Sequence, residues 1–287
     1  MSKKFFLDTS PFAFCISTNS SLVEHNLQTI YSSLLTPYDG QQSDYYVQLN
    51  AGKGLRRVFR RQAHFFTDQY EPFSPLSSEQ GYALLEWGMN YTIAANEMQH
   101  VIVHSAVLAK EDKAVLFPAP PGSGKSTLTC YLANNGWRLL SDEMALVVPN
   151  SNTVVPYVRP ICLKNQSISL AKNWFNDGAF SSIAPATHKG DVIHLSPPQA
   201  SWDARHQPAQ IAAIVFPQYR PDIALDIYAL DKQQSFMQLA ENAFNYGVVG
   251  SVGFDTITQL VEKSACFEVH YNSLKEVEAF LTEELMA

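Results

Sequence analysis

Residues 119–127 read Ala-Pro-Pro-Gly-Ser-Gly-Lys-Ser-Thr, and this stretch constrains the fold more than any other part of the chain. It matches the phosphate-binding P-loop pattern, except that Ala119 stands where the pattern begins with glycine. Such a loop is persuasive only between a buried strand and a helix. The apolar run 113–118 predicts the strand, and apolar residues spaced three to four apart within 126–135 predict the helix. The stretch therefore predicts an α/β fold.

The residue types in this loop each have a chemical reason. Glycines let the backbone approach a polyphosphate closely and point successive N–H groups at it. Lys125 would reach the β- and γ-phosphates, and the Ser126 hydroxyl would contact Mg²⁺. ATP and Mg²⁺ are therefore the expected cofactors. The predicted cofactor-binding residues in the loop are Gly122, Ser123, Gly124, Lys125, Ser126 and Thr127.

Two adjacent acids, Asp142 and Glu143, end the next apolar stretch, 137–141. A P-loop enzyme needs an acid at such a strand end to hold the metal ion. A kinase also needs a carboxylate that takes the proton of the attacking hydroxyl. We predict that Asp142 serves as the base and, with Ser126, as a metal contact. A solvated acidic turn is the alternative interpretation.

His104 is a candidate because of its place in a predicted hairpin. If 101–110 and 113–118 pair as antiparallel strands, position 104 lies opposite position 119, at the entrance of the loop. An imidazole there could hold the γ-phosphate or tune Asp142. A histidine packed in the core is the alternative.

Lys189, followed by Gly190, is the predicted further phosphate contact. Phosphoryl transfer spreads negative charge over the equatorial oxygens, and cationic side chains stabilise that charge. Arg159 and Lys164 are weaker candidates for the same role. For each of the three, an ordinary exposed cation is an equally plausible interpretation.

Composition narrows the class of partner. The chain of 287 residues has 27 acidic and 20 basic side chains, a net charge of −7, which argues against nucleic acid and favours a protein or peptide partner. No segment approaches the ~20 apolar residues needed to cross a bilayer, so no membrane partner is expected. The cysteines lack metal-ligand spacing and indicate reduced thiols in a cytoplasmic protein. They are Cys15, Cys130, Cys162 and Cys266.

Three blocks of sequence follow one another in a recognisable order: 104–108, the loop 119–127, and 136–143, which reads Gly-Trp-Arg-Leu-Leu-Ser-Asp-Glu. In these blocks the chain resembles the HPr kinase/phosphorylase group, and most closely the HPr kinase-related kinase A family. Glu143 stands where HPr kinases have a second aspartate. The Arg-Gly signature loop of the true HPr kinases is not found. Less similar stretches are 85–90, 159–165 and 187–198.

The resemblance implies a P-loop kinase core whose mixed sheet is similar to that of phosphoenolpyruvate carboxykinase. It implies Mg·ATP as donor and a serine hydroxyl as acceptor. By the same resemblance, His104, Lys125, Asp142 and Glu143 form the catalytic set. A reverse phosphorylase reaction and a homo-oligomer, both known in the relatives, stay open.

A Pro- and Ser-rich stretch, 71–78, is the expected domain boundary. Residues 1–75 would form a smaller N-terminal region of short strands with no assigned role, and 76–287 the P-loop kinase-like domain. Helices are expected from a Ser77–Gln80 capping box to about 93, from Asp231 to a Gly247 cap, and after Ser273.

The sequence thus predicts an ATP-dependent kinase that transfers the γ-phosphoryl group to a hydroxyl, with serine of a protein or peptide as the first choice. A non-catalytic nucleotide-binding adaptor is the alternative from another functional class. Transfer to a small molecule is a third. The sequence does not identify the acceptor.

Overall fold

A computed structural model describes residues 2–57 and 59–286 and divides the chain into two compact units. The first unit combines Met1–Asn96 with Pro160–Ser196, and the second combines Glu97–Arg159 with Pro197–Ala287. This division differs from the boundary expected near residue 75. Helix α2 (Gly81–Asn96) packs on strands of the first unit, and the chain returns to that unit after Arg159.

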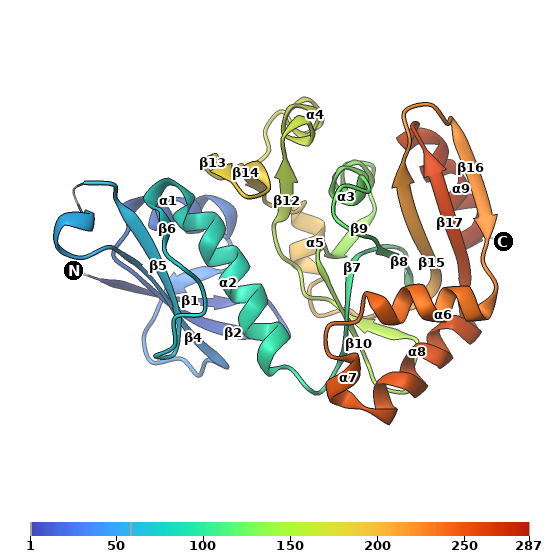
Figure 1. Cartoon of the computed structure of the whole chain (residues 1–287), viewed down its shortest axis with the longest axis horizontal. Helices are drawn as coiled ribbons and strands as arrows, with labels where there is room; N and C mark the ends of the chain where they lie inside the picture. The colour runs from blue at the N-terminus through green and yellow to red at the C-terminus, as the bar shows by residue number, and fades with distance from the viewer. Residues whose placement is uncertain (1, 58, 287) are drawn as a thin grey trace. The chain divides into compact units, whose positions relative to one another are not determined.

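The first unit is built on a mixed sheet with strand order β3-β1-β2-β4-β5-β6 (Figure 1). Helix α1 (Ser21–Ile30) packs against α2, and α2 packs on β4 and β5. Alternate residues of these strands, such as Leu49 and Phe65, are therefore buried. The strands are β1 (Lys3–Asp8), β2 (Ala13–Thr18), β3 (Leu35–Pro37), β4 (Tyr45–Ala51), β5 (Gln62–Thr67) and β6 (Leu76–Ser77), with 3₁₀ turns η1 (Gly54–Arg57) and η2 (Ser78–Gln80).

The returning segment of the first unit forms a small antiparallel sheet with strand order β12-β14-β13. Its strands are β12 (Ile161–Lys164), β13 (Ala184–Thr187) and β14 (Gly190–Leu195), and helix α4 (Gln166–Trp174) follows β12. Gln80 donates from its side-chain amide to the Pro185 carbonyl at 2.7 Å. The capping box expected between Ser77 and Gln80 is therefore wrong, and Ser77 makes no side-chain cap.

The second unit contains a larger mixed sheet with strand order β11-β10-β7-β8-β15-β17-β16. Strands β8, β15 and β17 are parallel, whereas β7 and β16 run antiparallel to their neighbours, so the expected α/β class with a mixed sheet is confirmed. Strand β9 pairs with β7, and β11 also pairs with β15. The bounds are β7 (Val101–Lys110), β8 (Lys113–Pro118), β9 (Arg138–Ser141), β10 (Met144–Val147), β11 (Thr153–Val155), β15 (Ala209–Tyr219), β16 (Leu225–Ala229) and β17 (Ala265–Tyr271).

Helices surround this sheet and bury its apolar strands (Figure 1). Helix α9 packs on β17, while α6 and α7 pack against α8. The apolar run of β8 is buried throughout from Ala114 to Pro118, as the sequence predicted. The helices are α3 (Lys125–Asn134), α5 (Gln199–Asp203), α6 (Lys232–Glu241), α7 (Tyr246–Val249), α8 (Ser251–Lys263) and α9 (Leu274–Met286).

The helix expected from Asp231 to Gly247 is shorter in the structure. Asp231 caps α6 in a capping box with Gln234, but the helix ends at Glu241. Residues 242–245 instead run beside β7: the His104 N–H donates to the Asn242 carbonyl at 2.7 Å. Pairing with a strand edge ends the helix because these backbone groups serve the sheet rather than the next helical turn.

Within the described chain, none of the helices combines the length and the apolar character that a membrane crossing requires.

Candidate functional site

The predicted phosphate loop lies between β8 and α3, as the motif requires. Gly122 and Gly124 both adopt left-handed backbone angles, with φ of +91° and +88°. Gly124 is also the N-cap residue of α3, and the Leu128 N–H donates to its carbonyl at 3.0 Å. Ser126 and Thr127 therefore stand in the first turn of α3, where backbone N–H groups lack intrahelical acceptors and favour an anion.

Two tyrosines at the ends of neighbouring parallel strands support this loop. The Tyr219 N–H, at the end of β15, donates to the Ser123 carbonyl at 2.9 Å. The Tyr271 hydroxyl, at the end of β17, donates to the Gly124 carbonyl at 3.4 Å. Burial, and secondarily Tyr219, raises the pKa of Tyr271 well above its ordinary value. Tyr271 therefore stays protonated and keeps its donor near neutral pH.

Gly124 is the position in the loop least able to carry a side chain. A Cβ there would lie 2.7 Å from the Tyr271 hydroxyl and 2.9 Å from the Tyr219 Cβ, whereas a Cβ at Gly122 would meet nothing within 4 Å. Gly124→Ala should therefore destabilise the protein by about 3 kcal/mol, from backbone strain and overlap combined. Thermal unfolding measures this loss.

Gly122→Ala is the matched control for that prediction, because its φ is nearly the same and its surroundings are open. It should cost about 1 kcal/mol, from backbone strain alone. Equal losses of stability in the two variants would show that the tyrosines do not constrain the loop.

Lys125, the first residue of α3, contacts His104 of β7. Lys125 Nζ and His104 Nε2 are 3.2 Å apart. The lysine is only 9% exposed, and its ammonium is held at the start of the helix rather than extended into solvent. The imidazole thus lies beside the cation that the motif assigns to the phosphates, as the hairpin argument anticipated.

Strand β7 brings the loop and the acidic pair together. Ser105 pairs with Pro118 of β8, the last residue before the loop. On the other side of β7, the Ser105 N–H donates to the Glu143 carbonyl at 3.2 Å. Three segments that are well separated in sequence therefore converge at the middle of one strand.

The register distinguishes the two acids. Met144 of β10 lies opposite His104, and Ser141, the last residue of β9, continues that register opposite Val107, although β9 shifts register by one residue before Ser141. Asp142 and Glu143 form the bend between β9 and β10, and the bond from Ser105 to Glu143 continues the pairing of β10 into this bend. Counted back from Met144, the alternation places Asp142 on the face of Met144 and His104, and Glu143 on the other face. Asp142 is therefore the stronger candidate for chemistry beside His104.

The Asp142 carboxylate acts electrostatically on the Cys130 thiol of α3. Burial, and secondarily the negative charge of Asp142, raises the pKa of Cys130 to about 12. Such an electrostatic effect requires the carboxylate to lie close to the thiol. Asp142 is 1% exposed, which makes it a buried acid next to the helix that begins at the phosphate loop rather than a solvated turn.

His104 is held in place by a segment that the sequence did not single out. The Phe244 ring stacks on the imidazole, with centroids 5.3 Å apart and planes 26° from parallel. The Phe244 N–H donates to the Ile102 carbonyl at 2.8 Å, and the Asn245 side-chain oxygen accepts from the Ile102 N–H at 2.9 Å. These contacts fix the segment 242–245 against the strand that carries His104.

The residues of the loop fit a phosphate ligand. The Ser123 hydroxyl oxygen is buried and has no hydrogen-bond partner among residues 2–57 and 59–286, an uncommon arrangement that a ligand oxygen would relieve. In the same described ranges, no group of three His, Cys, Asp or Glu residues could hold a metal ion. Mg²⁺ commonly uses one or two protein ligands together with phosphate oxygens, so Ser126 and Asp142 remain its predicted contacts.

Comparison with known proteins leaves the family open. No protein-family model matches the chain. No curated protein matches it significantly either. The resemblance to HPr kinase-like proteins therefore remains a prediction that rests on the three sequence blocks.

Lys189 falls in a different compact unit of the chain from the other predicted site residues. It belongs to the first unit, whereas the loop, His104, Asp142 and Glu143 belong to the second. Within the first unit, its ammonium lies 5.5 Å from the centre of the Trp87 ring. A cation–π contact accounts for this position without a phosphate.

Sequence reasoning missed Tyr219, Tyr271 and Phe244 around the loop. The two tyrosines end strands that are distant in sequence, and the parallel order β8-β15-β17 brings those ends to the loop. One signal was available for them, because ligands of α/β sheets commonly bind beyond the carboxyl ends of parallel strands. Phe244 lay within a stretch interpreted as helix, so no local signal indicated it.

Proposed function

We propose that the protein is an ATP-dependent kinase that transfers the γ-phosphoryl group to a hydroxyl, with a serine of a protein or peptide as acceptor. One observation carries the proposal: the P-loop lysine, His104 and the buried acid Asp142 converge around a single strand, β7. A buried carboxylate near the loop can hold Mg²⁺ in any P-loop protein, and in a kinase a carboxylate also takes the proton of the acceptor hydroxyl.

Each residue has a distinct role in the proposed reaction. The backbone of 122–127 and the Lys125 ammonium bind and orient the phosphates of ATP, with Mg²⁺ supplying charge neutralisation when it is bound. His104 accepts from the Lys125 ammonium through Nε2 and so steadies the cation that binds the γ-phosphate. Asp142 accepts the proton of the attacking hydroxyl. Glu143, on the other face of the strand, acts at most indirectly.

The acceptor class follows from the resemblance and from charge. The three matching blocks favour a serine hydroxyl, as in HPr kinases. The excess of acidic side chains, with 27 acids against 20 bases, makes a nucleic-acid acceptor unfavourable. A protein or peptide hydroxyl is thus the substrate that these observations support best.

Phosphoryl transfer tests the proposal directly. The full-length protein is incubated with γ-labelled ATP, Mg²⁺ and a peptide library, and the label on peptides is measured. We expect transfer by the native protein and a background level with an Asp142→Ala variant. Tight binding of ATP without transfer above that background would instead support the nucleotide-binding adaptor.

Phe244 should matter because it supports His104. Removing its ring in Phe244→Ala frees the imidazole to turn away from Lys125, and we expect turnover to fall about tenfold with little change in the KM for ATP. Phe254→Ala is the matched control: Phe254 is 51% and Phe244 52% exposed, but the Phe254 ring packs on Phe236. An equal loss of turnover in both variants would contradict a role through His104.

A further inference from the structure

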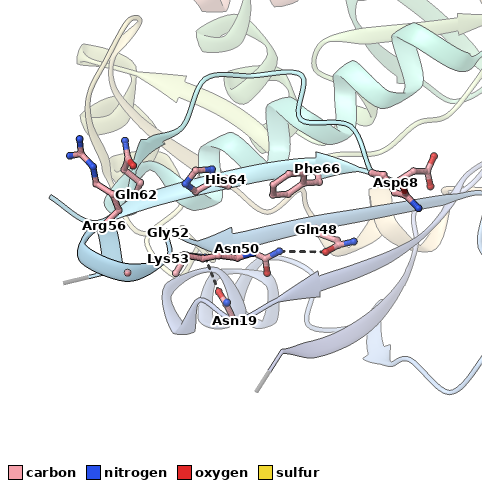
Figure 2. Close-up of a pocket in the computed structure, with 13 residues that line it drawn as sticks. Asn19, Gln48, Asn50, Gly52, Lys53, Arg56, Gln62, His64, Phe66 and Asp68 are labelled. Carbon is pink, nitrogen blue, oxygen red and sulfur yellow. Dashed lines mark hydrogen bonds between the residues drawn. The ribbon is translucent and has the colours of Figure 1, made fainter. Parts of the chain in front are cut away.

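The first unit carries an open groove that the proposed chemistry does not use. It lies over β4 and β5, on the sheet face whose side chains alternate with the buried residues under α2, and has a volume of about 870 Å³ (Figure 2). This volume is near the upper end of the usual range for ligand pockets. The lining residues are Asn19, Gln48, Asn50, Ala51, Gly52, Lys53, Gly54, Arg56, Gln62, His64, Phe66, Asp68 and Gln69.

The floor of the groove consists of paired side chains on two antiparallel strands. Gln48 lies opposite Phe66, and Asn50 lies opposite His64, so amides and rings form two parallel rows (Figure 2). The His64 and Phe66 rings are stacked, with planes 12° apart. His64 Nδ1 forms a hydrogen bond with Glu71 Oε1, and the two atoms are 2.7 Å apart. Carboxamides donate and accept hydrogen bonds, and flat rings pack against planar groups, as peptide units require.

One end of the groove is strongly cationic. Residues 53–61 contain five Lys or Arg and no acid, in a chain whose net charge is −7. Lys53 and Arg56 line the groove, and Arg60 and Arg61 are exposed nearby in sequence. None of these four side chains forms an ion pair with a residue that the structure describes. Uncompensated cations beside a polar groove favour an anionic ligand.

The opposite end has the opposite charge. Asp68 follows β5 at the end away from Lys53 and Arg56, as Figure 2 shows. The groove therefore has a direction: cationic at the loop after β4 and acidic at the turn after β5. A uniformly charged polymer such as nucleic acid matches only one end, whereas a polypeptide can carry acidic side chains at one end and neutral or basic ones at the other.

We propose that this groove binds an extended segment of a partner polypeptide, with acidic side chains of the segment beside Lys53 and Arg56. The segment lies across the floor of amides and rings. Its acidic side chains balance the positive charges of Lys53 and Arg56, which form no ion pair with a residue that the structure describes. From Gln48 to its end at Ala51, β4 spans about 10 Å, enough to contact three or four residues of an extended peptide. This binding does not rest on phosphoryl transfer.

Fluorescence anisotropy of the full-length protein, without nucleotide, tests the proposal. The probe is a fluorescein-labelled peptide whose first half alternates Glu and Thr and whose second half alternates Gln and Thr, and its counterpart has Gln in place of every Glu. We expect the acidic peptide to bind about tenfold more tightly than its counterpart. The double variant Lys53→Glu/Arg56→Glu should lose about tenfold in affinity for the acidic peptide and gain affinity for a Lys/Thr peptide.

Lys172→Glu is the control, because it makes one of the two charge reversals of the double variant at an exposed lysine on α4 of the same unit. It should leave peptide binding unchanged. Equal affinity for the Glu and Gln peptides, equal effects of the control and the double variant, or loss of binding without the gain for the Lys/Thr peptide would overturn the proposal. So would tighter binding of a single-stranded oligonucleotide that depends on Lys53 and Arg56, which would indicate a nucleic-acid site.

Discussion

Lys125→Ala should weaken ATP binding by about ten- to a hundredfold, because a charged donor to the phosphates is lost. Phosphoryl transfer should fall further, by about a thousandfold, since the ammonium also stabilises charge that grows as the phosphoryl group moves. Titration with a fluorescent ATP analogue measures the first effect. The labelled-ATP assay measures the second.

Lys275→Ala serves as the control for that variant. Lys275 is an exposed lysine of α9, so its loss removes the same charge from the same unit without touching the loop. It should leave ATP affinity and turnover unchanged. A Lys125→Ala protein that melts normally and still transfers phosphate at the native rate would contradict the proposed site.

Asp142→Asn should lower phosphoryl transfer by about a thousandfold, because an amide cannot accept the proton of the acceptor hydroxyl. The substitution preserves shape, so ATP affinity should change far less than turnover. Glu143→Gln, which alters the acid on the other face of the strand, should reduce turnover by about threefold at most. A comparable loss of turnover in the two variants would contradict the inference that only Asp142 lies on the face of His104.

A second readout of Asp142→Asn does not depend on activity. The Asp142 charge contributes to raising the pKa of Cys130 to about 12, so the amide should lower that pKa while burial still holds it above its ordinary value. Thiolate absorbance in the ultraviolet, recorded against pH and compared with a Cys130→Ala/Asp142→Asn protein, follows this change. An unaltered thiol titration would place the carboxylate away from α3.

The loop and its flanking elements could be predicted from the sequence because their signals are local. An apolar run with its turn residues defines β8, and the glycine-rich loop and the periodic apolar residues define α3. His104 required one further step, the register of the β7–β8 hairpin, which short connections make predictable. Its 3.2 Å contact with Lys125 agrees with that register.

Two local predictions were wrong because residues distant in sequence bind the same backbone or side-chain groups. The helix expected to reach Gly247 ends at Glu241 because the edge of β7 competes for the backbone of 242–245. The Ser77–Gln80 capping box does not form because the Gln80 amide donates to Pro185, which is distant in sequence. In each case a tertiary partner overrode a local preference.

By itself, the sequence determined the glycine-rich loop, its flanking strand and helix, and the position of the acids that follow, because these depend on neighbours along the chain. Tertiary structure alone decided which acid shares a face with His104, which tyrosines leave no room for a Cβ at Gly124, and how the chain divides into units. It also decided that Gln48, Asn50, His64 and Phe66 line one groove. The physical reason is that the pairing of strands brings distant residues together. Which strands pair, and in which register, depends on the whole fold and cannot be deduced from any short stretch of the chain.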